Sequence, residues 1–218
     1  MYSQKTRKLV TLSMLSALAY GVMVLLKFPV VLFLSYEPKD VIIAIGGFLY
    51  GPISAMAMSV VVALVEMVTV SSTGIYGAIM NALSSCTFAC TAAFIYKKRR
   101  TVPGAAIGLV AGISVTVPVM LLWNYLMVPL YMGAPRAVVT QMLIPTFLPF
   151  NLLKYGLSSG ITMLLFKPII SGLSKSNLLP ALPTDDSTTR KLTTGTILIS
   201  GLIVATCVLF ILSWRGII

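Results

Sequence analysis

The sequence contains no histidine, and only five acidic residues stand against sixteen lysines and arginines in 218 positions. The absence of histidine removes the most common general base and metal ligand in proteins. The three cysteines, Cys86, Cys90 and Cys207, lie in apolar runs without carboxylate neighbours. We therefore expect no metal site and interpret the cysteines as small apolar residues in helix packing.

Motifs of phosphate chemistry and covalent catalysis are also missing. The sequence has no GxxxxGK[ST] phosphate loop, and no nucleophile can be paired with a histidine base. We expect neither an enzymatic activity nor a bound cofactor. If the protein moves a ligand uphill, the energy must come from another protein.

Charge is scarce for a chain of this length. Charged residues make up 10% of the sequence and hydrophobic residues 58%, with a mean hydropathy of +0.99. These values predict an all-α polytopic membrane protein in a lipid bilayer. The net charge of +11 does not indicate nucleic-acid binding, because basic residues cluster at span ends, as in 5–8 and 97–100. This positive-inside pattern predicts a cytoplasmic N-terminus.

Seven apolar runs predict the membrane helices. The first lacks the short apolar core and cleavage site of a signal peptide, so we expect it to stay as an anchor. The second rises only about 15 Å, too little to cross the membrane, and a Tyr50-Gly51-Pro52 turn joins it to the third. The predicted helices are 9–26, 41–50, 53–70, 76–96, 103–127, 147–167 and 194–214. The predicted organisation is a membrane domain (1–170), a cytoplasmic polar linker (171–193) and a further C-terminal transmembrane helix (194–218).

Costly polar side chains inside these spans gather near their outer ends. They are Glu66, Asn81, Asn124, Asn151 and Lys154. A charged residue at mid-membrane costs roughly 2.5–3.5 kcal/mol on insertion scales. Because Asn151 and Lys154 are three residues apart, they lie on one helix face. A polar outer half above an apolar inner half favours an outward-facing binding pocket over a through-pore.

Each of these residues also has a purely structural interpretation. Asn81 and Asn124 could hydrogen-bond neighbouring helices. Glu66 could be the ion-pair partner of Lys154, or have a separate role. Lys154 could extend to the outer surface. Their convergence at one depth is what favours a shared ligand, and nearby aromatic residues suit a flat heteroaromatic one.

The first span carries a stripe of small residues, Ser13, Ala17 and Gly21, spaced four apart. Such a stripe allows another helix to approach closely. Packing within the bundle and docking of a separate subunit are both consistent with it.

Several segments of the sequence resemble the riboflavin-binding S component of energy-coupling factor (ECF) transporters, the RibU family. They are Phe33–Asp40, Ile45–Pro52, Trp123–Leu126, Pro129–Gly133 and Leu148–Lys154. The resemblance implies a six-helix bundle in a bacterial plasma membrane that captures riboflavin from outside. It also implies a transmembrane coupling protein and two ABC ATPases as partners, and the seventh helix is additional to the family pattern.

The resemblance implies roles for individual residues. Asn124, Asn151 and Lys154 would be polar ligand contacts, with Asn81 and Tyr131 as weaker candidates. Leu34 and Tyr36 would form part of a lid. Ser13, Ala17 and Gly21 would match the docking motif for the coupling protein.

Two departures from the family pattern stand out, namely the charged loop Glu37-Pro-Lys-Asp40 and the additional apolar run, to which we assign no role. Two other functions remain open. One is an S component for another vitamin or heteroaromatic ligand, and the other is a non-transporting membrane scaffold.

Overall fold

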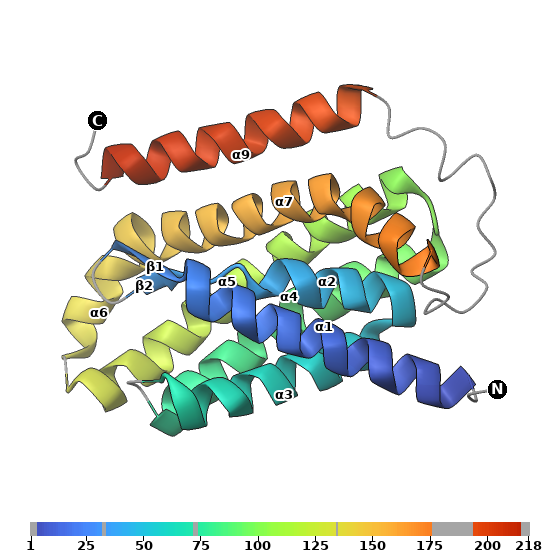
Figure 1. Cartoon of the computed structure of the whole chain (residues 1–218). Coiled ribbons are helices and arrows are strands. Elements are labelled where there is room, and N and C mark those ends of the chain that lie inside the picture. The colour runs from blue at the N-terminus through green and yellow to red at the C-terminus, as the bar shows by residue number, and fades with distance from the viewer. Residues whose placement is uncertain (1–3, 32–33, 72–73, 134, 176–193, 215–218) are drawn as a thin grey trace.

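The computed structural model describes residues 4–31, 34–71, 74–133, 135–175 and 194–214. Long helices lie alongside one another, and a short β-hairpin and α6 lie together at one end of the bundle (Figure 1). Among the described residues, six helical segments are long and apolar enough to span a membrane. The elements are α1 (Gln4–Leu26), β1 (Phe28–Val31), β2 (Leu34–Tyr36), α2 (Lys39–Tyr50), α3 (Pro52–Thr69), α4 (Gly74–Lys98), α5 (Val102–Met132), α6 (Arg136–Met142), the π-helix η1 (Leu143–Phe147), α7 (Leu148–Lys175) and α9 (Thr194–Trp214). The all-α membrane fold predicted from composition is confirmed.

The short helix α2 lies at the centre of the bundle. Its residues from Lys39 to Leu49 are all buried, as its uniformly apolar sequence after Asp40 requires. A Cβ added at Gly47 would lie 2.9 Å from Cβ of Ala55, so glycine permits the close contact with α3. The helix ends at Gly51, whose φ of 91° favours glycine, and α3 begins at Pro52.

The ends of several helices differ from the predicted ones. Pro129 favours an early end of the fifth helix, but α5 continues for a further turn to Met132 and is capped by left-handed Gly133. The next segment, which lies between the fifth and sixth predicted helices, forms α6 and η1. Pro145 lies inside η1, and its missing N–H is consistent with the local change to π-helical bonding.

The hairpin was not predicted. β1 and β2 pair antiparallel in the segment between the first and second predicted helices. The short length of the strands explains why their alternation gives little signal.

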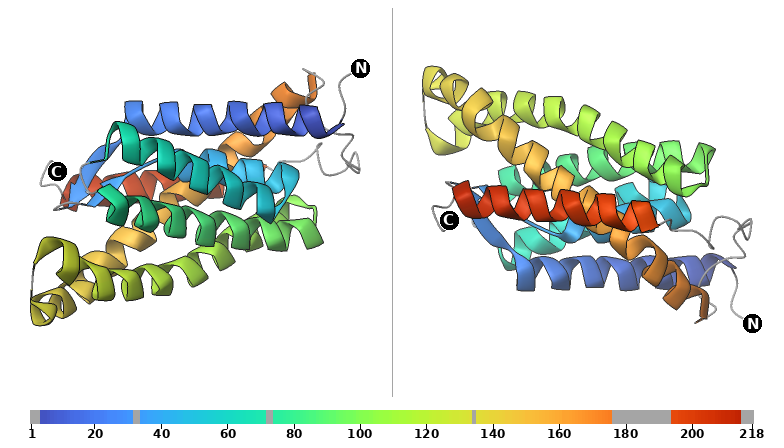
Figure 2. Two further views of the ribbon diagram at one scale, coloured as in Figure 1. Left: turned by 90° about the horizontal axis from the view of Figure 1, so that it is seen from below. Right: turned by 90° about the horizontal axis from the view of Figure 1, so that it is seen from above.

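The additional helix α9 packs outside α7, on the side of the bundle away from α3 (Figure 1, Figure 2). Its other surfaces carry exposed large apolar residues, as a lipid-facing helix requires. The linker predicted at 171–193 lies largely outside the described residues.

Candidate functional site

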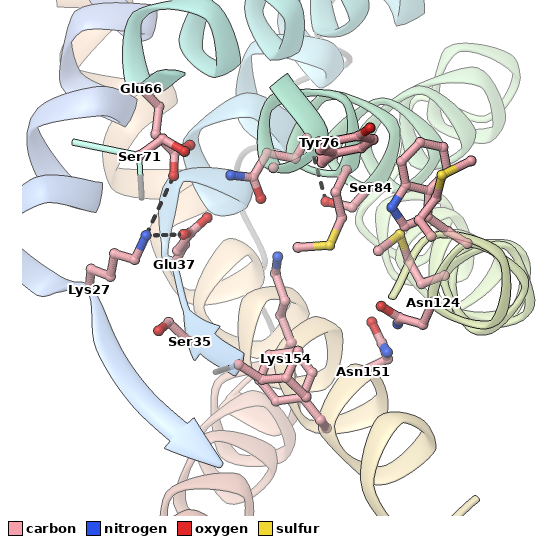
Figure 3. A pocket seen from close by; sticks show the side chains of 18 residues that line it. Lys27, Ser35, Glu37, Glu66, Ser71, Tyr76, Ser84, Asn124, Asn151 and Lys154 are labelled. Carbon is pink, nitrogen blue, oxygen red and sulfur yellow. Dashed lines mark hydrogen bonds and ion pairs between the residues drawn. The ribbon is translucent and has the colours of Figure 1, made fainter. Parts of the chain in front are cut away.

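A cavity opens at the hairpin end of the bundle, between the hairpin, α3, α4, α5 and α7 (Figure 3). The empty space in the cavity and at its mouth measures about 990 Å³. The lining residues are Lys27, Leu34, Ser35, Glu37, Glu66, Ser71, Tyr76, Gly77, Met80, Asn81, Ser84, Met120, Trp123, Asn124, Met127, Phe150, Asn151 and Lys154.

The cavity brings together five of the seven residues suggested as ligand contacts. Leu34 reaches it from β2, Asn81 from α4, Asn124 from α5, and Asn151 and Lys154 from α7. In Figure 3 the amides of Asn124 and Asn151 lie next to each other, and Lys154 extends into the same space. Residues more than a hundred positions apart in sequence therefore share one wall.

The other two suggested contacts are not placed at the cavity. Tyr36 is buried against α7, where its hydroxyl lies 3.4 Å from Oγ of Ser158. Its ring packs 5.3 Å from that of Phe28, centroid to centroid. Tyr36 thus holds the hairpin to α7 and does not line the cavity. The side chain of Tyr131 lies outside the part of the chain that the structure describes.

The two asparagines differ in their hydrogen bonding. Nδ2 of Asn151 donates to the carbonyl of Phe147, 2.8 Å away, in the π-helical turn that precedes α7. Asn124 is 2% exposed, and its Oδ1 has no hydrogen-bond partner among the described residues. An unpaired buried acceptor costs about 1–3 kcal/mol. Asn124 is therefore poised to accept a hydrogen bond from a donor in the cavity.

Lys154 is held by an acidic partner from another helix. Its Nζ lies 3.5 Å from Oδ2 of Asp40, which is fully buried at the start of α2. The other oxygen, Oδ1 of Asp40, accepts a hydrogen bond of 2.5 Å from Oγ of Ser85. The Lys154 ammonium also lies 5.5 Å from the ring centroid of Tyr155, within cation–π range. These contacts fix the ammonium in the cavity wall.

Glu66 is the centre of a second group of charges and does not pair with Lys154. It contacts the buried ammonium of Lys39 and lies 3.5 Å from that of Lys27. Glu37 joins the same lysines, at 2.7 Å from Lys27 and 2.6 Å from Lys39. The interpretation of Glu66 as the partner of Lys154 is thus wrong, because α2 supplies the nearer opposite charges to both.

The charges in and behind the cavity wall balance. Burial opposes ionisation of Glu37, but the charges of Lys39, Lys154 and Lys27 outweigh it and lower its pKa to about 2. Burial likewise opposes the charge on Lys27, yet its two carboxylate neighbours raise its pKa. Three ammonium groups face three carboxylates: Lys27, Lys39 and Lys154 against Glu37, Asp40 and Glu66. The site suits an uncharged ligand that carries hydrogen-bonding groups.

Some lining residues were not predicted from the sequence. Lys27 and Glu37 flank the hairpin; Glu37 was noted only as part of the charged loop Glu37-Pro-Lys-Asp40, and Lys27 was not singled out. Met80, Met127 and Phe150 supply apolar surface, which is indistinguishable in sequence from ordinary helix packing.

A second concavity lies on the opposite side of the molecule from α9, between α1 and α3. It measures about 930 Å³ together with the open space at its mouth, and it includes Ser13 and Ala17, which are exposed. Gly21 lies one turn further along α1, and a Cβ added there would meet nothing within 4 Å. The small-residue stripe is therefore not buried by packing within the bundle.

Comparison with known proteins places the chain among transport proteins. A family model described as "ECF transporter, substrate-specific component" matches residues 7–166. The riboflavin transporter RibU of Staphylococcus aureus (strain TCH60) is 26% identical over 181 residues, which cover 79% of this chain and 95% of that protein. The riboflavin transporter FmnP of Bacillus subtilis (strain 168) is 28% identical over 174 residues, covering 74% and 91%.

A solved structure described as "Structure and mechanism of the S component of a bacterial ECF transporter" has the same fold. It matches with a TM-score of 0.66 and 28% sequence identity, covering 78% of this chain and 98% of that one. The helix α9 lies beyond the residues that the family model matches.

Proposed function

Because the chain belongs to the family of ECF transporter substrate-specific components, we propose that the substrate it captures is riboflavin. Membership makes it the substrate-binding membrane subunit of an ECF importer, a multi-pass membrane protein that is not an enzyme. Riboflavin is favoured because both relatives described above are riboflavin transporters.

The observation that carries the proposal is the buried, unpaired Oδ1 of Asn124 in one cavity with Asn151 and Lys154. The flavin ring system is flat, neutral and edged with donors and acceptors, so it matches an apolar cavity with a few fixed polar groups. Asn124 would accept a ring N–H, the neighbouring amide of Asn151 would donate to or accept from the same polar edge, and Lys154 would donate to an acceptor of the ring system. The balanced charges of the wall avoid placing an unpaired charge against a neutral ligand.

We place the cavity on the extracellular side and the N-terminus in the cytoplasm of a bacterial cell. The support is the distribution of basic residues, since clusters at 5–8 and 97–100 lie at the end opposite to the hairpin. The hairpin residue Leu34 then acts as part of a lid over an outward-facing site.

Energy and inward release would come from partners. We propose that a transmembrane coupling protein with two ABC ATPases docks on the groove between α1 and α3, where Ser13 and Ala17 are exposed and Gly21 leaves space. Small exposed residues permit close approach of a partner helix within the membrane.

Uptake of labelled riboflavin tests the proposal. Cells that cannot make riboflavin and that express an ECF module should accumulate the vitamin only when this chain is present and ATP is available. Uptake that is lost in the double variant Asn151→Ala and Lys154→Ala, with the protein still present in the membrane, supports the site. Uptake without the chain, or of a different vitamin only, contradicts it.

A further inference from the structure

The helix α9 packs closely against α7 at two glycines of α7. A Cβ added at Gly160 would lie 2.8 Å from Cγ2 of Val204 and 3.2 Å from the carbonyl oxygen of Ser200. A Cβ added at Gly156 would lie 3.5 Å from Sγ of Cys207. The two glycines, four residues apart, let α9 approach closely, in the manner of small-xxx-small contacts in membranes. The two glycines thus fix the position of α9 along α7.

The C-terminal end of α9 reaches the hairpin. Ile211 is 5% exposed, whereas Leu209 on the same helix is 56% exposed. Ile211 belongs to one buried apolar cluster with Val30 of β1 and Leu34 of β2, and Trp214 packs against this cluster. α9 therefore contacts both α7, which carries Lys154, and the hairpin, whose residue Leu34 lines the cavity.

The hairpin depends on such contacts for its position. Strands of four and three residues are too short to be stable by pairing alone. Leu34 faces the cavity, so any displacement of β2 changes the cover of the site.

We propose that α9 braces the hairpin over the cavity, and that Ile211 is a positioning residue for Leu34. The brace raises the fraction of time that the cover stays closed and so slows ligand escape. A six-helix chain would leave this side of the hairpin to lipid. The role rests on the contacts of α9, and only the identity of the ligand used to measure it rests on the proposed function.

Hydrogen exchange of the full-length, ligand-free protein tests the brace. Ile211→Ala removes buried apolar contacts, and Leu209→Ala removes the same number of carbon atoms from the exposed face. We expect amide exchange in Phe28–Val31 and Leu34–Tyr36 to become about five- to tenfold faster in Ile211→Ala. Exchange in α3 should not change. The Leu209→Ala protein should match the wild type.

A disulfide crosslink tests the packing of α9 against α7. In a protein with Cys86→Ala and Cys90→Ala, the substitution Gly156→Cys places a second thiol beside Cys207. A mild oxidant should join them in membranes, taking up the two electrons and two protons that the thiols lose. The same protein with Cys207→Ser gives the uncrosslinked reference. The absence of a crosslink would show that α9 does not pack against α7 at this position, and would overturn the proposal.

The dissociation rate of riboflavin tests the functional effect of the contact between α9 and the hairpin. Riboflavin should dissociate about five- to tenfold faster from Ile211→Ala than from Leu209→Ala, with little change in the association rate. Unchanged hairpin exchange in Ile211→Ala would overturn the brace, as would equal effects of the two variants. If the wild type binds no riboflavin, the proposed function fails, whereas hydrogen exchange still decides the role of α9.

Discussion

Replacing Lys154 by methionine removes the ammonium from the cavity wall and keeps most of the side-chain volume. Lys154 is 7% exposed, so water does not replace its contact with a bound ligand. A hydrogen bond from a charged donor is worth about 1.5–3 kcal/mol. We therefore expect riboflavin to bind about ten- to hundredfold more weakly to Lys154→Met. Quenching of flavin fluorescence measures the dissociation constant, and the thermal midpoint in detergent reports whether the variant folds.

The role of Asp40 makes this prediction sharper. Asp40 lies 3.5 Å from the ammonium and does not line the cavity, so it affects the ligand only through Lys154. Asp40→Asn should weaken binding in the wild type and should not weaken it further in Lys154→Met. A double-mutant cycle measures this coupling. Additive losses, or a dissociation constant for Lys154→Met within twofold of the wild type, would refute the assignment of Lys154 to the site.

Four further expectations follow from the described contacts. Asn124→Ala removes the unpaired acceptor and should weaken riboflavin binding about tenfold with little loss of stability, because Oδ1 of Asn124 makes no hydrogen bond within the described residues; a titration beside a thermal melt checks this. Ala17→Leu fills an exposed groove position, so it should spare binding and abolish uptake with the ECF module, whereas loss of both would indicate misfolding. Glu66→Gln leaves the buried ammonium of Lys39 with less compensation and should destabilise the protein by about 3–5 kcal/mol in a denaturation experiment, and an unchanged melt would contradict it. The pKa of Glu37 is lowered from 4.5 to about 2, so its ion pairs stabilise the fold above about pH 4.5 and lose this effect as the pH falls toward 2. The melting temperature of the wild type should therefore drop across that pH window more than the melting temperature of Glu37→Gln.

The sequence predicts the membrane fold well because its main signal is long-range and additive. Runs of about 20 apolar residues have few alternatives to transmembrane helices, and the predicted spans correspond to helices of the structure. Their ends were less predictable. Pro129 suggests a helix end, yet one lost hydrogen bond near the terminus was tolerated and α5 reached Met132.

The candidate site shows a similar division. Asn124, Asn151 and Lys154 were predicted because polar groups inside a membrane span are costly and rare, and the structure lines one cavity with them. The partner of Lys154 was not predictable, because Asp40 lies on α2, which is far from α7 in the sequence. Lys39, next to Asp40 on α2, likewise forms an ion pair with Glu66 from another helix. Such pairing depends on the direction of each side chain, which hydropathy and spacing do not encode.

The position of Tyr36 illustrates the same limit. The resemblance suggested both Leu34 and Tyr36 for the lid, and residues two apart on a strand do share a face. Both are buried on β2, and the register irregularity of the hairpin lies on β1, between Pro29 and Val31. Leu34 lines the cavity, whereas the hydroxyl of Tyr36 reaches Ser158 on α7.

The central claim is that one cavity in this chain binds riboflavin, and a titration of the purified wild-type protein tests it most directly. Riboflavin fluorescence should be quenched saturably with one ligand per chain. Lumichrome, which keeps the ring and lacks the ribityl chain, should compete. The absence of saturable quenching by protein that melts cooperatively would contradict the claim. Binding that lumichrome does not displace would contradict recognition of the ring by Asn124, Asn151 and Lys154.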